Sequence, residues 1–330
     1  MIIKSIKLTN FRNHQSYFLN CEKDTTLILG QNGCGKTSVL EAIYILTRGK
    51  SFRATDLDIL KRGTDYYRIE LEYESGEIIT ATFDGKIKSF LMADKKTRRL
   101  PKTHKYPVIL FQPSDLNLIS HSPGRRREYF DRVFSQLSDI YSLHLSKYEK
   151  ALKQRNELLK NDFISKDALF SWNLLLAKYG AGLFDLRQKF IQEINTNLTK
   201  VYQSIADNQD EIEIIYKTEA LPSGEYLKVL ENNFNKDTYL GHTSFGIHRD
   251  DYIFMFNHQP ADGSASRGET RSIILALKFI EADLISGKTN QKPIILLDDV
   301  FSELDNIRRK CLVDNFKDNQ VIITSVEAIE

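Results

Sequence analysis

The chain has 330 residues, which is long enough for one large domain with an insertion or for two domains. Hydrophobic residues make up 41% and charged residues 27%, as in ordinary globular proteins, and the net charge of +2 means that any attraction to nucleic acid must come from local patches. The three cysteines (Cys21, Cys34 and Cys311) have no paired spacing, which argues for a reducing compartment and against a zinc site.

The chain begins MIIKSIKLTN, which lacks the apolar core of a signal peptide, and no run reaches the ~20 apolar residues of a membrane span. We therefore expect a cytoplasmic protein with no membrane partner. Residues 2–8 alternate between apolar and polar side chains and predict a strand. Arg12 and Asn13 follow between two predicted strands, where they either meet a base or phosphate of a ligand or form a solvated turn.

Residues 27–47 combine a short apolar strand, a glycine-rich loop and a helix with one apolar face. The loop Gly30-Gln31-Asn32-Gly33-Cys34-Gly35-Lys36-Thr37, with Ser38 after it, matches the phosphate-loop pattern G-x-x-x-x-G-K-[ST] in full. Glycines let the backbone approach a polyphosphate, and the N–H groups at the helix start attract anions. Lys36 is expected to reach the β- and γ-phosphates of ATP, and the Thr37 hydroxyl to bind Mg²⁺. The alternative is a glycine-rich turn that happens to precede Lys-Thr.

The segment 66–92 alternates again and predicts a β-meander with two short turns. Residues 86–105 are the most basic stretch of the chain, and Lys95, Lys96, Arg98 and Arg99 lie within it. Such a run is either a solvated hairpin face or a contact to the phosphate backbone of DNA, which needs charge and little else.

Residues 107–111 form a short apolar strand that ends at Gln112. Ligands of a sheet gather at strand ends, so Gln112 is a candidate magnesium ligand. From Arg125 on, apolar residues recur at helical spacing through Leu158, and a second helical tract runs from about Ala168 to Ile205. Two long helices with a short connection predict an antiparallel helical arm. Arg125, Arg126 and Arg127 at its start are either a DNA contact or a solvated first turn.

Motifs that suit phosphate chemistry resume near the end of the chain. Ser266-Arg267-Gly268-Glu269 precedes a predicted helix from Thr270 to Ile285, and the apolar strand 294–297 ends at Asp298 and Asp299. One carboxylate at a strand end can hold Mg²⁺, and its neighbour can orient the water that attacks ATP. The alternative is a strand-end turn. Ser302-Glu303-Leu304-Asp305 follows, and 321–323 predicts a last strand.

These motifs stand in the order used by ABC-type ATPases, and Asn10-Phe11-Arg12-Asn13 resembles the opening of their SMC-like branch. More narrowly, the chain resembles the RecF family of bacterial DNA repair ATPases over nearly its whole length. The matching stretches are Pro113–Leu116, Pro123–Arg126, Gly246–Asp251 and Leu297–Asp305.

The chain also departs from these patterns. The RecF family usually has Ser-x-Gly-Gln as its signature, whereas this chain has glutamate at Glu269. Where transporters carry a histidine after the last strand this chain has Thr324, and Asp299 replaces their glutamate, as in the RecF family. These differences bear on the rate of hydrolysis more than on the family.

The resemblance implies an α/β fold: an ABC-type P-loop ATPase head with a mixed sheet, formed by residues 1–122 and 236–330, and an inserted, mainly helical arm at 123–235. It also implies an ATPase in which two heads bind two ATP molecules, each between one chain's phosphate loop and the partner's signature. In that arrangement Ser266, Gly268, Glu269 and Asp305 join Arg12 and Asn13 among the nucleotide-binding residues, and Lys36, Asp298 and Asp299 serve catalysis.

The implied role is in DNA replication, recombinational repair and the SOS response. The ATP-dependent homodimer would close on DNA at gaps or single-strand/duplex junctions, and slow hydrolysis would reopen it. RecR-like and, in some cases, RecO-like mediators are the implied partners. A nucleotide-binding subunit of an ABC transporter and another SMC-like ATPase remain as alternatives, although the arm is too long for the first and too short for a structural SMC protein.

Overall fold

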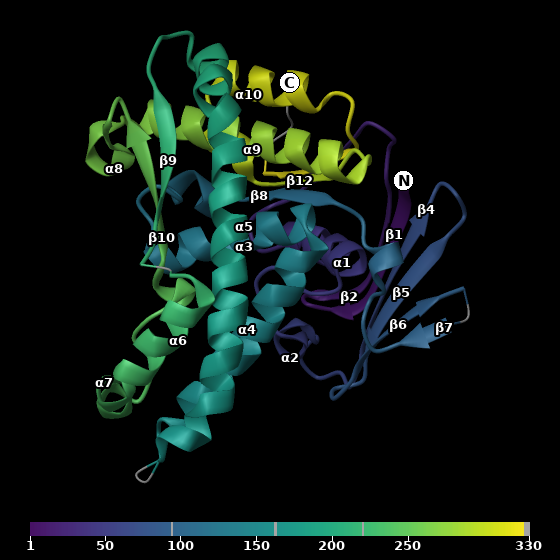
Figure 1. Cartoon of the computed structure of the whole chain (residues 1–330). Helices are drawn as coiled ribbons and strands as arrows, with labels where there is room; N and C mark the ends of the chain where they lie inside the picture. Colours follow the sequence, from purple (N-terminus) through teal and green to yellow (C-terminus); the bar gives the residue numbers. More distant parts are fainter. Residues whose placement is uncertain (94, 162–163, 220, 327–330) are drawn as a thin grey trace. The chain divides into compact units, whose positions relative to one another are not determined.

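The computed structural model describes residues 1–93, 95–161, 164–219 and 221–326 (Figure 1). The chain divides into two compact units, which we call the head unit (Met1–Asp115 with Ala282–Glu330) and the arm unit (Leu116–Glu281). The expected insertion at 123–235 falls inside the arm unit, which also includes the segment from 236 to 281. The division expected from the sequence, into an ATPase head at 1–122 and 236–330 and an arm at 123–235, stays a prediction.

The head unit contains an antiparallel sheet of six strands. Its order is β2 (His14–Asn20), β1 (Ile3–Phe11), β4 (Tyr67–Tyr73), β5 (Ile78–Phe83), β6 (Lys88–Met92) and β7 (Lys95–Thr97). Buried and exposed side chains alternate along β4, because successive side chains of a strand point to opposite faces of a sheet. The predicted strand near the N-terminus and the predicted meander are therefore parts of one sheet.

A second sheet of the head unit is parallel. Its order is β3 (Thr25–Leu29), β13 (Val321–Ser325), β12 (Ile294–Asp298) and β8 (Val108–Phe111). Every residue of β8, β12 and β13 is buried, which is why these strands appear in the sequence as unbroken apolar runs. The head unit therefore has both parallel and antiparallel strands, as expected, but the two kinds belong to different sheets.

Helix α1 (Lys36–Arg48) contacts strands of both sheets. Its residues from Val39 to Thr47 are all buried, because this helix has a sheet on either side rather than one solvent-facing stripe. The head unit also holds α2 (Asp56–Ile59) and α10 (Asn306–Phe316), together with 3₁₀ turns at Lys102–His104 and Val300–Glu303. A further 3₁₀ turn, Pro113–Asn117, spans the boundary between the two units. The core of the head unit is therefore centred on the helix that follows the glycine-rich loop.

The arm unit is built on three helices, α3 (Pro123–Leu137), α4 (Asp139–Leu158) and α5 (Lys166–Ala206). The sequence predicted one continuous helix from Arg125 to Leu158, but the structure has two helices here, with Ser138 between them. The extended backbone of Ser138 ends α3, and its hydroxyl accepts a hydrogen bond from the Tyr141 N–H, which caps α4. Helix α5 packs against α4, so the expected helical pair is present.

The rest of the arm unit is a small antiparallel sheet and shorter helices. The sheet has the order β11 (Gln259–Pro260), β10 (Asp251–Phe256) and β9 (Ile212–Lys217). The helices are α6 (Ser223–Asn232), α7 (Phe234–Leu240), α8 (Ala261–Ser264) and the part of α9 (Arg267–Thr289) up to Glu281, with a 3₁₀ turn at Ile247–Arg249. Figure 1 shows α5 running alongside β9 and β10, and α5 is in contact with β9.

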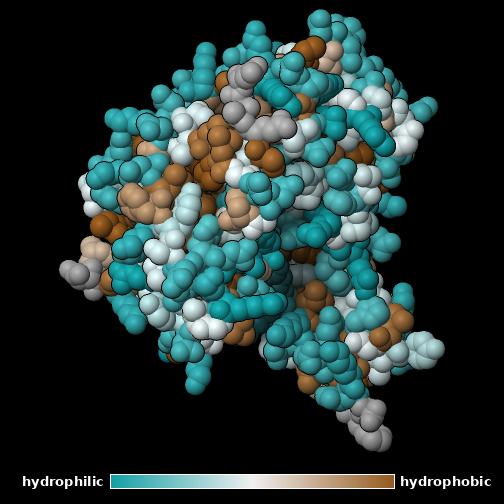
Figure 2. Space-filling view, turned by 180° about the vertical axis from the view of Figure 1, so that it is seen from behind, coloured by the Kyte–Doolittle hydropathy of each residue, from teal (hydrophilic) through white to brown (hydrophobic). Residues whose placement is uncertain are grey.

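Hydrophilic residues cover most of the face shown in Figure 2, and exposed apolar side chains form separate patches on it. Within the part of the chain that the structure describes, none of the helices has the length and apolar character needed to cross a membrane.

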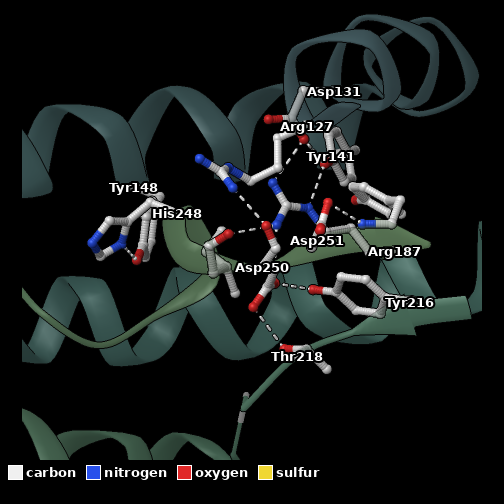
Figure 3. A network of polar contacts seen from close by, with 12 residues as sticks. Arg127, Asp131, Tyr141, Tyr148, Arg187, Tyr216, Thr218, His248, Asp250 and Asp251 are labelled. Carbon is white, nitrogen blue, oxygen red and sulfur yellow. Dashed lines mark hydrogen bonds and ion pairs between the residues drawn. The ribbon is translucent and has the colours of Figure 1, made fainter. Parts of the chain in front are cut away.

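A buried arginine ties the arm unit together (Figure 3). The Arg187 guanidinium, on α5, donates to Asp131 Oδ1 at 2.8 Å and to Asp250 Oδ2 at 3.1 Å. It also donates to the Tyr141 hydroxyl at 2.9 Å and to the Ile247 carbonyl at 2.8 Å. These partners come from α3, α4 and the turn before β10, so one side chain joins elements that are far apart in the sequence.

We expect Arg187→Met to destabilise the arm unit by about 3–5 kcal/mol, because it leaves the carboxylates of Asp131 and Asp250 without their buried cation. Urea unfolding followed by fluorescence measures this, since the single tryptophan, Trp172, lies on α5 of the same unit. The matched control is Arg125→Met, at a side chain that is 66% exposed, where we expect a change within about 0.5 kcal/mol. Equal losses in the two variants would show that the buried ion pairs add little.

Candidate nucleotide site

The four parallel strands of the head unit end at one edge. Phe111 pairs with Leu297, Asp298 pairs with Thr324, and Ser325 pairs with Leu29. The residues that follow these positions therefore meet at the carboxyl edge of the sheet, where ligands of such sheets bind. They are Gln112 after β8, Asp299 after β12 and the glycine-rich loop after β3.

The loop has the backbone conformation that its glycines allow. Gly33 and Gly35 have φ values of 82° and 102°, in the left-handed region that disfavours other residues. A Cβ on Gly35 would lie 2.3 Å from His14 Nε2, and the same His14 nitrogen is 3.1 Å from the Gly35 carbonyl. The Asn13 amide donates to the Gly33 carbonyl at 3.2 Å. The β1–β2 turn thus packs directly against the loop.

Lys36 is buried at the start of α1. Its ammonium donates to the Gly30 carbonyl at 2.8 Å and to the Gln31 carbonyl at 3.3 Å, so the loop curls around it. The same nitrogen lies 3.6 Å from Asp299 Oδ2. A cation held at the centre of a loop of backbone N–H groups is the arrangement that binds a polyphosphate.

Thr37 and Asp298 form the link between the loop and the sheet. The Thr37 hydroxyl donates to Asp298 Oδ1 at 2.7 Å, and the Thr324 hydroxyl donates to the same oxygen at 3.1 Å. Burial raises the pKa of Asp298 above its usual range, although the two hydroxyls counteract this. A hydroxyl beside a carboxylate at this edge is the oxygen donor set that Mg²⁺ takes in phosphate sites.

Asp299 has a strained backbone, with φ at 51°, and its N–H donates to the hydroxyl and the carbonyl oxygen of Thr324 at 3.0 and 3.2 Å. Its Oδ1 atom is buried and has no hydrogen-bond partner among the described residues. A buried carboxylate oxygen without a partner costs free energy. It can accept a hydrogen bond from a ligand or a water molecule.

These elements surround a pocket of about 550 Å³. Its walls include about half of the predicted nucleotide-binding residues, namely Arg12, Asn13, Asn32, Gly33, Gly35, Lys36, Thr37 and Ser38. The predicted catalytic residue Asp299 lines the pocket as well. Arg53, Ala54 and Asp58 also line it, and sequence reasoning missed them. They belong to a polar, irregular segment whose pattern predicts no ligand, and only the fold brings this segment beside the loop.

Other predicted residues of the head unit lie at the same sheet edge or near it. Gly30, Gln31 and Cys34 are parts of the loop itself, and Gln112 follows β8 with its N–H donating to Asp115 Oδ2 at 3.1 Å. Asp305 caps α10, where its carboxylate accepts from the Arg308 N–H at 3.0 Å and pairs with the Arg308 guanidinium.

The signature segment lies in the arm unit, at the start of α9. The Ser266 N–H donates to the Glu269 carboxylate at 2.6 Å, and the Glu269 N–H donates to the Ser266 hydroxyl at 3.3 Å. This reciprocal pair is a capping box, which satisfies N–H groups at the helix start. Gly268 lies between them in the first turn of α9.

The basic candidates differ in their surroundings. Lys95, Lys96, Arg98 and Arg99 are all exposed, on β7 and just after it. Arg125 is exposed as well, whereas the Arg126 guanidinium makes two bonds to Asp251, at 2.7 and 2.8 Å. Arg127 donates to the Asp250 carbonyl at 2.6 Å (Figure 3). Arg126 and Arg127 therefore have internal partners, which leaves Arg125 as the best placed of the three for an external phosphate.

Comparison with known proteins identifies the family. A family model described as an AAA ATPase domain matches residues 1–325. The chain is 36% identical over 342 residues to the DNA replication and repair protein RecF of Natranaerobius thermophilus, with 95% of this chain and 88% of that protein covered. It is 32% identical over 338 residues to RecF of Lachnoclostridium phytofermentans, with 98% and 92% covered. The chain belongs to the RecF family.

Comparison with solved structures leads to the same family. The recombination mediator protein RecF with ATP, of the RecFOR pathway, matches with a TM-score of 0.85 and 28% identity, covering 100% of this chain and 93% of that one. The Smc head domain of Pyrococcus furiosus matches with a TM-score of 0.52 and 17% identity, which shows the fold alone. The protein is thus a RecF-family ATP-binding ATPase of DNA replication and repair, with an SMC-like head and a helical arm. This family takes precedence over the alternative of a transporter subunit.

We expect Asp299→Asn to retain ATP binding and to lower the hydrolysis rate by roughly 10²–10⁴-fold, because an amide cannot accept a proton from water as a carboxylate does. Rates measured with saturating ATP, beside the ATP affinity of the same sample, test this. Hydrolysis within a few-fold of the unsubstituted protein would assign the activation of water to another residue.

Proposed function

We propose that this RecF-family ATPase binds DNA as an ATP-dependent head-to-head dimer at gaps or single-strand/duplex junctions, and that slow hydrolysis resets it. The observation that best supports an ATP-driven cycle is the pocket in which Lys36, Thr37 and Asp299 stand around one curled loop. The ammonium of Lys36 suits the phosphates, the hydroxyl of Thr37 suits a magnesium ion, and the carboxylate of Asp299 suits the attacking water.

The nucleotide chemistry follows from these groups. The Lys36 ammonium binds the β- and γ-phosphates, and exchanges its carbonyl partners in the loop for phosphate oxygens. Thr37, Asp298 and Gln112 would hold Mg²⁺, which would neutralise charge on the phosphates. Asp299 orients the attacking water through its unpaired oxygen. Arg12 and Asn13, from the β1–β2 turn, complete the pocket opposite the sheet edge.

DNA contacts are proposed at the exposed basic residues. Lys95, Lys96, Arg98 and Arg99 lie at the edge of the six-stranded sheet, where β7 is the last strand. An edge strand with several cations presents charge to a rod-shaped polyanion without needing a shaped pocket. Arg125, at the first turn of α3, is the candidate in the arm unit, although Glu128 lies 3.2 Å away.

Partners are proposed from the relatives. A similar solved protein is described as a mediator of the RecFOR pathway, and on this basis we propose RecR-like and, in some cases, RecO-like proteins as partners. We also propose a role in DNA replication, repair and the SOS response, carried out in the cytoplasm.

Neutralising Lys95, Lys96, Arg98 and Arg99 together, each to glutamine, is expected to weaken binding to all DNA sequences alike. The log–log slope of affinity against salt should shrink by roughly 3–4, at ~0.9 for each duplex phosphate that is no longer neutralised by a side chain. Fluorescence anisotropy with labelled duplex DNA and ATP measures the slope.

The control removes the same charge from α4 and the residues just after it, where Lys147, Lys150, Lys153 and Lys160 are exposed, and it should leave the slope nearly unchanged. If the control variant shows the smaller slope instead, the DNA surface lies on the arm unit.

Mixed dimers test the proposal that Ser266 acts on the partner's ATP. Ser266→Arg should leave ATP binding by the monomer intact, yet block ATP-driven dimerisation by placing bulk and positive charge against the partner's loop. A Lys36→Ala chain should lose ATP binding. Mixed, the two chains can form one intact site, from the loop of the first and the signature of the second, and ATPase activity should partly return.

Analytical ultracentrifugation with ATP, and ATPase rates of each chain alone and of the mixture, measure these effects. If Ser266→Arg alone already loses ATP affinity as a monomer, the signature acts within its own chain and the dimer mechanism is wrong.

A further inference from the structure

Glu41, in the second turn of α1, is a fully buried carboxylate that no phosphate-loop pattern includes. It accepts five hydrogen bonds. Arg12 donates from Nε at 2.9 Å and from Nη2 at 2.7 Å, and Arg53 donates from Nε at 3.2 Å and from Nη2 at 3.0 Å. The Ser51 hydroxyl adds a bond at 2.6 Å. One carboxylate therefore holds two arginines from different segments of the chain.

Glu41 is charged in this arrangement. Burial by itself would raise its pKa, but the bonds from Arg12, Arg53 and Ser51 outweigh burial and lower the pKa of Glu41 below its usual value. The site therefore contains one negative charge between two positive charges. Without the carboxylate, the two guanidinium groups would repel each other, and each could turn to a different partner.

The hydrogen bonds leave a defined part of each guanidinium available. A guanidinium has five N–H donors in a planar fork, and Glu41 takes one from Nε and one from Nη2 of each arginine. Arg12 gives one more to the Asp58 carbonyl, at 3.0 Å. Within the described residues, two N–H groups therefore remain on Arg12 and three on Arg53.

Both arginines line the pocket that contains Lys36 and Thr37, whereas Glu41 does not line it. Both arginines thus form part of the pocket wall and keep N–H groups that no described residue takes, whereas Glu41 is not part of that wall. Paired, planar N–H donors match the oxygens of a phosphate group better than an ammonium does.

We propose that Glu41 is a positioning residue that holds Arg12 and Arg53 side by side as a phosphate-binding pair for the nucleotide. The proposal rests on the proposed nucleotide site, and it goes further because Glu41 itself touches no ligand. Helix α1 thereby contributes twice to the site. Its first turn binds phosphate directly, and its second turn sets the two arginines that close the pocket from the other segments.

The test uses three forms of the full chain: the unsubstituted protein, Glu41→Gln, and the triple variant in which Arg12 and Arg53 are also glutamine. Isothermal titration of the monomer with ATP gives the dissociation constant and the stoichiometry separately. The triple variant carries no charge at this cluster, so it avoids leaving a lone buried carboxylate.

We expect Glu41→Gln to weaken ATP binding by ~10–100-fold with the stoichiometry unchanged, because both arginines lose their fixed orientation. The triple variant should then bind ATP within about 3-fold of Glu41→Gln. A dissociation constant for Glu41→Gln within about 2-fold of the unsubstituted protein overturns the proposal. So does a triple variant that is much weaker than Glu41→Gln, since the arginines would then act without Glu41.

A matched control separates positioning from stability. Asp237, in the arm unit, is also a fully buried carboxylate, and it pairs with Arg155 at 2.7 Å. Asp237→Asn should lower the melting temperature but leave ATP affinity unchanged. If Glu41→Gln only lowers the stoichiometry, at an unchanged dissociation constant, its role is structural and the proposal fails. Lys36→Ala distinguishes a failure of the Glu41 proposal from a failure of the proposed nucleotide site. If that variant still binds ATP normally, the nucleotide site itself is wrong.

Discussion

The hydrogen bond from Thr37 to Asp298 joins residues 261 positions apart, and the nucleotide site depends on it. One partner lies in the first turn of the helix that follows the glycine-rich loop, and the other ends a central strand of the parallel sheet. The bond is partly buried, and losing one partner would leave a polar group with poor access to water, which costs free energy. The loop therefore cannot shift along the sheet edge without breaking it, and Lys36 and Asp299 are held at fixed positions beside it.

Buried charges are used in both units, and in each case the charge is satisfied by several partners. In the head unit a single carboxylate, Glu41, is surrounded by two arginines, and in the arm unit a single arginine, Arg187, is surrounded by two aspartates. Buried ion pairs are weak evidence for stability, because desolvation offsets the attraction between the charges. Their geometry is specific, however, since a planar guanidinium accepts few arrangements of partners. In the head unit the paired arginines line a pocket. In the arm unit the paired arginine joins helices α3, α4 and α5 to the turn before β10.

The signature segment shows how one set of residues can serve both structure and function. Ser266 and Glu269 satisfy each other in a capping box at the start of α9. A glutamate keeps this cap as well as a glutamine does, so the departure at Glu269 from the usual RecF pattern costs the helix nothing. It does place a negative charge where, in the proposed dimer, a γ-phosphate would approach.

Neighbouring residues in the chain were enough to predict the local parts of this protein. The phosphate loop is a local motif, because its tight turns need glycine. The residues expected to bind phosphate and Mg²⁺, Lys36 and Thr37, follow the loop directly at the helix start. Apolar runs predicted the parallel strands, and their ends predicted Asp298 and Asp299. The helical pair of the arm followed from periodicity, except for the break at Ser138, where one side chain caps a new helix.

Which distant residues share a site, in contrast, depends on how the chain packs. Arg53 and Glu41 have no motif, and they meet because α1 packs between two sheets and brings its second turn beside the segment after it. The same reason explains Arg126, for which the sequence left a DNA contact or a solvated turn open, but whose guanidinium forms an ion pair with Asp251. A charged residue shows its type in the sequence, but its partner is chosen by the packing of the chain, because burial makes an unpaired charge too costly to keep.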